Sequence, residues 1–189
     1  MPTNICVYCS SSDDIDRQYF DTARELGTAL GQRNDTLIYG GGSVGLMGEV
    51  ARSCHEHGGK VVGVIPESLK TAEIAYHQAD ELIVTETMSE RKQLMFTRGD
   101  AFIILPGGFG TLEELAEVLV LRVLKYQDRP IIILNCHGFY DRLVDLFEHF
   151  IEEKFAKPKH RALYSVLTTV DEALAAIDQT ATPTGSEFD

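Results

Sequence analysis

Residues 101–125 read AFIILPGGFGTLEELAEVLVLRVLK. The first five residues are apolar without alternation, which is typical of a strand that helices cover on both faces. The Pro-Gly-Gly that follows indicates a turn, and the remainder has the length and the apolar content of a helix. A buried strand, a glycine-rich loop and a helix in this order are the start of a βαβ unit, the building block of parallel sheets.

The same alternation runs through the whole chain. Strands are expected at residues 5–9, 36–39, 60–65, 81–85, 101–105, 130–134 and 166–168, and helices at 14–32, 45–57, 89–97, 111–125, 140–153 and 170–178. The pattern predicts the α/β class: a Rossmann-like, doubly wound parallel sheet of about seven strands, in a single domain over residues 1–179. The Thr, Pro, Gly and Ser content of residues 180–189 predicts a disordered tail.

The overall charge is acidic. The 189 residues include 17 Lys and Arg and 29 Asp and Glu, so the formal net charge is −12, and such a surface repels the phosphate backbone of nucleic acids. A small phosphate is still compatible with this charge, because local cations act within a screening length of about 10 Å. The first apolar run, residues 5–9, is much shorter than the roughly 20 residues that span a bilayer. We therefore expect a cytoplasmic protein, with no nucleic-acid polymer and no membrane as a partner.

Cysteine and histidine residues do not form a metal or disulfide pattern. The four cysteines are too few and too scattered for a disulfide framework. Cys6 and Cys9 match C-x-x-C, but they lie inside a strand-like run and their spacing places the two thiols on opposite faces. His55 and His57 are two apart, so they do not share a helix face. We expect buried structural cysteines, no metal and no cofactor.

Two glycine-rich loops follow expected strands and lead into helices. Residues 40–48 read GGGSVGLMG and residues 106–114 read PGGFGTLEE. Ligands of open parallel sheets bind beyond the carboxyl ends of the strands, where glycine allows close approach and the N–H groups of a helix start bind phosphate. The alternative for each loop is a tight turn in which glycine only permits a positive φ. Together the loops predict a phosphorylated nucleoside or a similar small anion as the ligand.

Other glycine-loop chemistries fit less well. Gly40, Gly42 and Gly45 match the dinucleotide pattern G-x-G-x-x-G, with Glu67 as a candidate ribose-binding acid. That pattern follows the second strand, and no further domain holds a hydride donor or acceptor. Neither loop has the Lys-Ser/Thr ending of a Walker A motif, and the G-x-S-x-G elbow of many serine hydrolases is missing. NAD binding therefore stays a weaker alternative.

Charged residues accompany the second loop. Arg91 and Lys92 open a helix just after the strand expected at 81–85, where two cations can neutralise a phosphate; ordinary surface basicity is the alternative. Thr111 and Glu114 have the spacing of a capping box, in which the threonine caps the helix and the glutamate bonds back to its N–H group. This spacing leaves open whether Glu114 caps the helix or faces a substrate.

The helix expected at 111–125 is apolar on nearly every side. Its apolar residues are Leu112, Leu115, Ala116, Val118, Leu119, Val120, Leu121, Val123 and Leu124. A helix packed on a sheet normally keeps one face in water, so a second apolar face predicts contact with another subunit. A homodimer is the simplest closed assembly.

At these residues the chain resembles the LONELY GUY family, the cytokinin riboside 5′-monophosphate phosphoribohydrolases, whose members were often mislabelled lysine decarboxylases. The matching pieces are residues 7–12, 39–48, 63–66, 88–92, 100–114 and 128–135, in family order. The combination of Arg91-Lys92 with P-G-G-x-G-T-x-x-E is far more specific than either glycine loop alone. We find no pyridoxal phosphate lysine motif that would support the decarboxylase label.

The resemblance implies a dimeric Rossmann-like enzyme that cleaves the N-glycosidic bond of adenine or N6-substituted adenine nucleoside 5′-monophosphates, releasing free base and ribose 5-phosphate. The implied site residues are Arg91 and Glu114 as the catalytic pair and, for substrate binding, Gly41, Gly42, Glu73, Met88, Lys92, Gly107, Gly108, Phe109, Gly110, Thr111, Leu112 and Glu113. A non-catalytic nucleotide or molybdenum-cofactor carrier of the same fold is the alternative function. Ser10 replaces a glycine common in the family, and Val120-Leu121 replaces Thr-Trp, which affects the expected base preference more than the reaction.

Such a reaction agrees with the residue types. Cleavage of a ribosyl bond passes through an oxocarbenium-like state that a carboxylate such as Glu114 can stabilise while it polarises the attacking water. Arg91 would keep that carboxylate ionised. No residue in the sequence is an obvious acid for protonating the departing base.

Overall fold

Seven parallel strands form one sheet in the computed structural model, which describes residues 2–70 and 75–181. The sheet order is β4-β3-β2-β1-β5-β6-β7. The strands are β1 (Asn4–Tyr8), β2 (Thr36–Tyr39), β3 (Lys60–Pro66), β4 (Glu81–Thr85), β5 (Ala101–Ile104), β6 (Ile131–Leu134) and β7 (Ser165–Leu167), and the helices are α1 (Arg17–Gln32), α2 (Gly45–Glu56), α3 (Met88–Arg98), α4 (Phe109–Val123), α5 (Asp141–Glu152) and α6 (Val170–Ala181). The predicted Rossmann-like, doubly wound sheet is confirmed.

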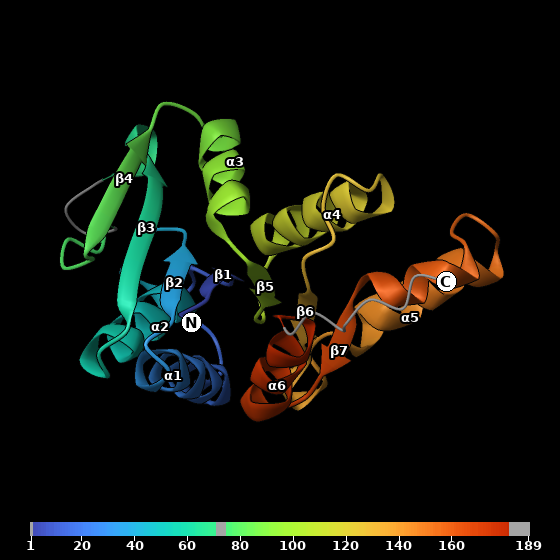
Figure 1. The fold of residues 1–189 in the computed structure, drawn as a ribbon, viewed down its shortest axis with the longest axis horizontal. Coiled ribbons are helices and arrows are strands. Elements are labelled where there is room, and N and C mark those ends of the chain that lie inside the picture. The colour runs from blue at the N-terminus through green and yellow to red at the C-terminus, as the bar shows by residue number, and fades with distance from the viewer. Residues whose placement is uncertain (1, 71–74, 182–189) are drawn as a thin grey trace, which may run out of the picture.

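Helices cover both faces of the sheet. Figure 1 shows α1, α2 and α6 together on one side of the strands, with α3 and α4 on the other. Apolar residues of α1, α2 and α6 pack with one face of the strands in one buried cluster, and those of α3, α4 and α5 pack with the other face. Cys9 belongs to the first cluster and Cys6 to the second, as the strand period predicts. All four cysteines are free and buried.

The order of the strands reverses beside β1. From β1 the chain adds β2, β3 and β4 on one side, and it then crosses to place β5, β6 and β7 on the other. Tyr8 at the end of β1 pairs with Ile104 at the end of β5, so the loops that follow these two strands leave the sheet together. In doubly wound sheets this reversal point is where ligands bind.

Helix boundaries differ from the expectations by one to three residues, with α1 beginning at Arg17 rather than at residue 14. Helix α4 begins at Phe109, two residues before the expected start. Helix α6 continues to Ala181, so the first two residues of the expected 180–189 tail are helical, while 182–189 lie outside the described residues. Within the described ranges, the helices are all too short or too polar to cross a membrane.

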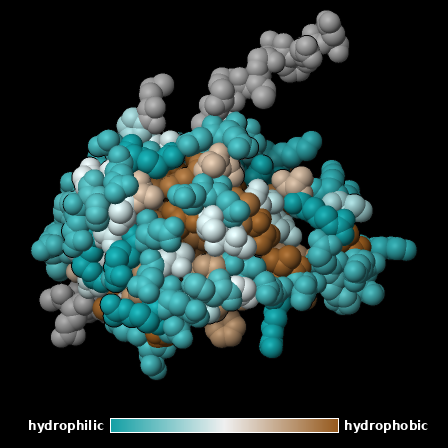
Figure 2. Space-filling view, turned by 90° about the horizontal axis from the view of Figure 1, so that it is seen from below, coloured by the Kyte–Doolittle hydropathy of each residue, from teal (hydrophilic) through white to brown (hydrophobic). Residues whose placement is uncertain are grey.

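Hydrophilic residues form most of the face drawn in Figure 2, with a small hydrophobic group near its middle.

Candidate active site

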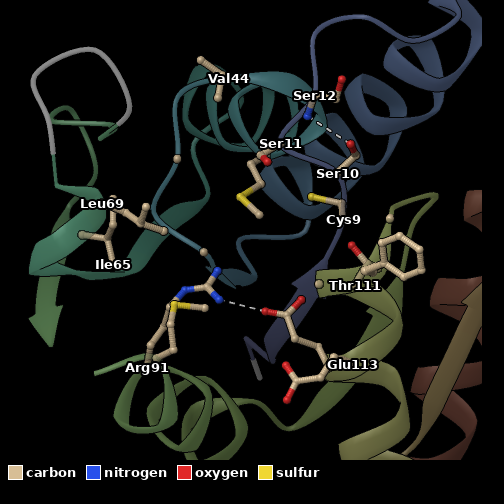
Figure 3. Close-up of a pocket in the computed structure, with 18 residues that line it drawn as sticks. Cys9, Ser10, Ser11, Ser12, Val44, Ile65, Leu69, Arg91, Thr111 and Glu113 are labelled. Atoms are coloured by element: carbon tan, nitrogen blue, oxygen red, sulfur yellow. Dashed lines mark hydrogen bonds and ion pairs between the residues drawn. The ribbon is translucent and has the colours of Figure 1, made fainter. Parts of the chain in front are cut away.

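A cavity of about 640 Å³ lies at the carboxyl ends of β1, β2, β3 and β5 (Figure 3). Its lining residues are Cys9, Ser10, Ser11, Ser12, Gly40, Gly42, Val44, Met47, Ile65, Leu69, Met88, Arg91, Gly108, Phe109, Gly110, Thr111, Glu113 and Glu114. This volume is in the range of pockets that hold a small molecule such as a nucleotide. Both predicted glycine loops reach the cavity, at the reversal point of the sheet.

A buried ion pair forms part of the cavity wall. Arg91 Nη1 on α3 donates to Glu114 Oε1 on α4 at 2.9 Å, drawn as a dashed line in Figure 3, and each residue is only 5% exposed. Arg91 Nε donates to the carbonyl of Val64 on β3 at 3.0 Å, which fixes the guanidinium plane. Within the described part of the chain, Arg91 Nη2 and Glu114 Oε2 have no hydrogen-bond partner. The structure thus brings together the two predicted catalytic residues and leaves each with an unused polar atom.

The ionisation of Glu114 follows from its surroundings. Burial raises the pKa of its carboxyl above the ordinary value, and the neighbouring Arg91 guanidinium opposes this rise. Removing a charge from water is costly unless an opposite charge is close, so the carboxylate depends on Arg91 for its ionised form. Cys9 also lines the cavity, but burial raises the pKa of its thiol so far that it stays protonated.

The predicted capping box does not form. Gly108 occupies the N-cap position of α4, so Thr111 is the third residue inside the helix rather than its cap. Glu114 accepts a hydrogen bond from Arg91 instead of bonding back to the N–H group of Thr111. The spacing was misleading because α4 begins at Phe109, two residues before the threonine. Of the two roles left open for Glu114, capping is therefore wrong.

The start of α4 is open toward the cavity. Among the described residues no side chain accepts a hydrogen bond from the N–H groups of residues 109–111, and the positive end of the helix dipole lies behind them. Gly108, Phe109, Gly110 and Thr111 all line the cavity. This arrangement suits a phosphate group.

The start of α2, which follows the first glycine loop, differs in one contact. The N–H group of Gly45 donates to Asp13 Oδ1 at 2.8 Å, so a carboxylate of the chain already occupies this helix start. Gly42 lines the cavity, whereas the carbonyl of Gly41 accepts a hydrogen bond from the N–H group of Tyr76. The first loop therefore supplies a wall of the cavity, and Asp13 opposes the pyrophosphate that a dinucleotide pattern would place at α2.

Several predicted substrate-binding residues lie outside the cavity lining. Lys92 forms ion pairs with Glu113 and, at 3.5 Å, with Glu117, and these pairs tie α3 to α4. Gly41, Gly107 and Leu112 are likewise not part of the lining. Glu73 lies outside the described residues. Met88, Gly42, Glu113 and residues 108–111 do line the cavity, as predicted.

Two groups of lining residues were not predicted as site residues. Ser10, Ser11 and Ser12 follow the end of β1, where the N–H group of Ser10 donates to the carbonyl of Pro106 and the carbonyl of Ser10 accepts from Met47 on α2. Apolar residues form another wall, in which Ile65 and Leu69 lie across the cavity from Thr111 (Figure 3). The position of residues 10–12 after the central strand was a usable signal, because function gathers at strand ends near the reversal point. No metal-binding group of three or more His, Cys, Asp or Glu side chains occurs in residues 2–70 and 75–181.

Comparison with known proteins places the chain in a family. A family model described as possible lysine decarboxylase matches residues 47–177. A protein from Oryza sativa subsp. japonica, named a probable cytokinin riboside 5′-monophosphate phosphoribohydrolase, is 41% identical over 175 residues, which cover 93% of this chain and 72% of the relative. A cytokinin riboside 5′-monophosphate phosphoribohydrolase from Arabidopsis thaliana is 40% identical over 177 residues, covering 94% and 82%. This chain belongs to the LONELY GUY family.

Solved structures with the same fold include proteins of a different kind. A molybdenum cofactor binding protein from Rippkaea orientalis has a TM-score of 0.74 at 20% identity, and the Moco carrier protein of Chlamydomonas reinhardtii has 0.72 at 24% identity; the similarity covers 96% of this chain and 99% of each structure. At such identities the likeness concerns the fold alone. The decarboxylase wording of the family model has no counterpart in the cavity, since no lysine is among its described lining residues.

Proposed function

We propose that this LONELY GUY family member hydrolyses the N-glycosidic bond of adenine or N6-substituted adenine nucleoside 5′-monophosphates, releasing the free base and ribose 5-phosphate. The observation that carries this proposal is the buried Arg91–Glu114 pair, which faces the same cavity as the open start of α4. The names of relatives about 40% identical over nearly the whole chain support the same reaction.

The two ends of the cavity suit the two ends of a nucleotide. The phosphate binds at the N–H groups of residues 108–111, and the base lies toward the apolar wall that contains Ile65 and Leu69. This orientation places the ribose between them, beside Arg91 and Glu114. The volume of about 640 Å³ leaves room for a substituent on the base.

The chemistry uses the carboxylate at the sugar. The bond between C1′ and the base nitrogen breaks, and its electron pair leaves with the base. Positive charge then develops at C1′ and the ring oxygen, where Glu114 Oε2 stabilises it and orients the attacking water. The water supplies the hydroxyl group that C1′ receives and the proton that the base receives. Arg91 keeps Glu114 ionised and can donate from Nη2 to the substrate.

Product analysis tests this proposal. We expect AMP and N6-isopentenyl-AMP to yield free base and ribose 5-phosphate, measured by chromatography, and adenosine to be cleaved far more slowly because it lacks the phosphate. Binding of both nucleotides without release of base would contradict the proposal. That outcome would favour the carrier alternative instead.

We also propose that the enzyme is a homodimer whose subunits meet through α4. Leu112, Val120 and Val123 are exposed on this helix, and they line an apolar groove shared with α5. A second copy of the same surface would remove these side chains from water. A cytoplasmic location is proposed from the four free, buried cysteines, which suit a reducing compartment.

A further inference from the structure

The guanidinium group of Arg91 is held on three sides. The carbonyl of Val64 accepts from Nε, and the carboxylate of Glu114 accepts from Nη1. The third side is the backbone of Gly40, directly after β2. A Cβ atom at residue 40 would overlap Arg91 Nη2, far inside the 3.0 Å below which such contacts essentially never occur, and would lie 3.0 Å from the sulfur of Met47.

The backbone of Gly40 does not itself require glycine. Gly41 and Gly45 in the same loop have positive φ values of 76° and 59°, a conformation that favours glycine, whereas Gly40 is not among the positive-φ residues. An alanine at residue 40 therefore meets no backbone strain of this kind. What the missing side chain provides is the space that the guanidinium of Arg91 occupies.

We propose that Gly40 is a positioning residue for the Arg91–Glu114 pair. This inference rests on the proposed function only for its effect on turnover. A methyl group at residue 40 displaces the end of the arginine side chain, which is flexible, so the fold survives while the ion pair does not. Misplacement of a catalytic group by about 1 Å is enough to cost roughly 100-fold in rate. Glu114 would also lose the cation that favours its ionised form.

The test compares Gly40→Ala with Gly27→Ala. At Gly27 a Cβ atom would lie 2.5 Å from the carbonyl oxygen of Val50, so this control introduces an overlap with backbone between α1 and α2, away from the cavity. We expect G40A to lower kcat for AMP about 100-fold and to move the acid limb of the pH profile to higher pH. KM should rise at most a few-fold from the displaced Nη2, because the phosphate contacts proposed at α4 remain. We expect G27A to lower the melting temperature and to leave kcat unchanged. Wild-type kcat in G40A would overturn the proposal.

A second comparison separates action through Arg91 from direct contact with the substrate. In an Arg91→Ala background, Gly40→Ala should change kcat/KM by less than about twofold, because the overlapping group is gone. The same 100-fold loss in that background would overturn the proposal.

Titration of Glu114 in the absence of nucleotide tests the positioning role of Gly40 without relying on turnover. The ¹³C signal of the Glu114 carboxyl, assigned with Glu114→Gln, should titrate at higher pH in G40A than in the wild type. An unchanged titration would contradict the positioning role. Failure of the wild type to hydrolyse any nucleotide would reject the proposed function. The Glu114 titration would then still test whether Gly40 positions the Arg91–Glu114 pair.

Discussion

The side chain of Arg91 connects three elements at the wall of the cavity. It reaches from α3 to a strand carbonyl and to a carboxylate on α4, and it is nearly fully buried while it does so. A buried pair of this kind adds little stability compared with apolar packing, because both charges lose their hydration. The effect of the pair is instead electrostatic, because the charge of Arg91 favours the ionised form of Glu114 beside the cavity.

The pH dependence of activity follows from this pair. Burial raises the pKa of Glu114, and the reaction needs the ionised form, so activity is present above that pKa and is lost as the pH falls through it. We expect the acid limb of kcat/KM at a higher pH than the ordinary glutamate value of about 4.3 would give. Arg91→Ala removes the opposing cation and should move this limb further upward.

Initial rates with AMP across the acid range measure this limb. Glu114→Gln, which cannot titrate, is the control, and its residual activity should lack the limb. An acid limb that persists unchanged in this variant would assign the titration to another group.

The starts of helices α2 and α4 lie at the same edge of the sheet but differ in their hydrogen bonds. Helix α4 leaves its first N–H groups open, whereas α2 has Asp13 bound at Gly45. A carboxylate at a helix start satisfies the same groups that would bind a phosphate. We therefore expect the nucleotide phosphate to bind at the start of α4, whereas Asp13 satisfies the start of α2.

Asp13→Ala tests this division. Loss of the contact at Gly45 should cost about 1 kcal/mol of unfolding free energy, the typical size of a capping interaction, and should lower the melting temperature by roughly 2–4 °C. KM for AMP should stay within about twofold, because Asp13 does not line the cavity. Asp16→Ala is a matched control, since Asp16 caps α1 through the N–H group of Gln18. A KM that falls several-fold in D13A alone would show that the phosphate binds at α2.

Sequence patterns predicted the strands and helices well because apolar runs and glycine-rich loops are local features of the sequence. The apolar runs at 101–105 and 130–134 are confirmed as β5 and β6, and the glycine loops mark the ends of β2 and β5. Arg91 and Glu114 were predicted through the family motif, and strand order brings them together.

Contacts between distant segments were not predictable in the same way. Asp13 accepts a hydrogen bond from Gly45, which is 32 residues away in the sequence, and no local pattern predicts this contact. Lys92 looked like a phosphate ligand, but its actual partners come from α4. The capping box at Thr111 was wrong because α4 begins two residues earlier and the carboxylate of Glu114 pairs with Arg91, which comes from α3.

For the whole molecule, the exposed apolar side chains of α4 contrast with the acidic composition. Leu112, Val120 and Val123 are each at least 41% exposed, and they face the same groove as Phe150 of α5. In the proposed homodimer, burial of such a surface would have to outweigh the long-range repulsion between two copies that each carry a net charge of −12.

Sedimentation at micromolar concentration tests the assembly. We expect a mass of about 42 kDa, twice the 21.0 kDa of one chain. Val120→Asp places a charge in the proposed interface and should shift the equilibrium toward monomer while the melting curve stays cooperative. A wild-type monomer near 21 kDa would reject the dimer, and the groove of α4 would then be covered only by the chain's own residues near 155–164.

Turnover of AMP by Glu114→Gln shows whether the Glu114 carboxylate takes part in the hydrolysis. The amide can still accept from Arg91, so we expect the variant to fold, with a lower melting temperature because the buried guanidinium loses its counter-charge. The charge that stabilises the sugar cation is gone. Loss of several kcal/mol of transition-state stabilisation corresponds to a fall in kcat of roughly 100-fold or more. Release of adenine by this variant at nearly the wild-type rate would contradict a catalytic role for Glu114.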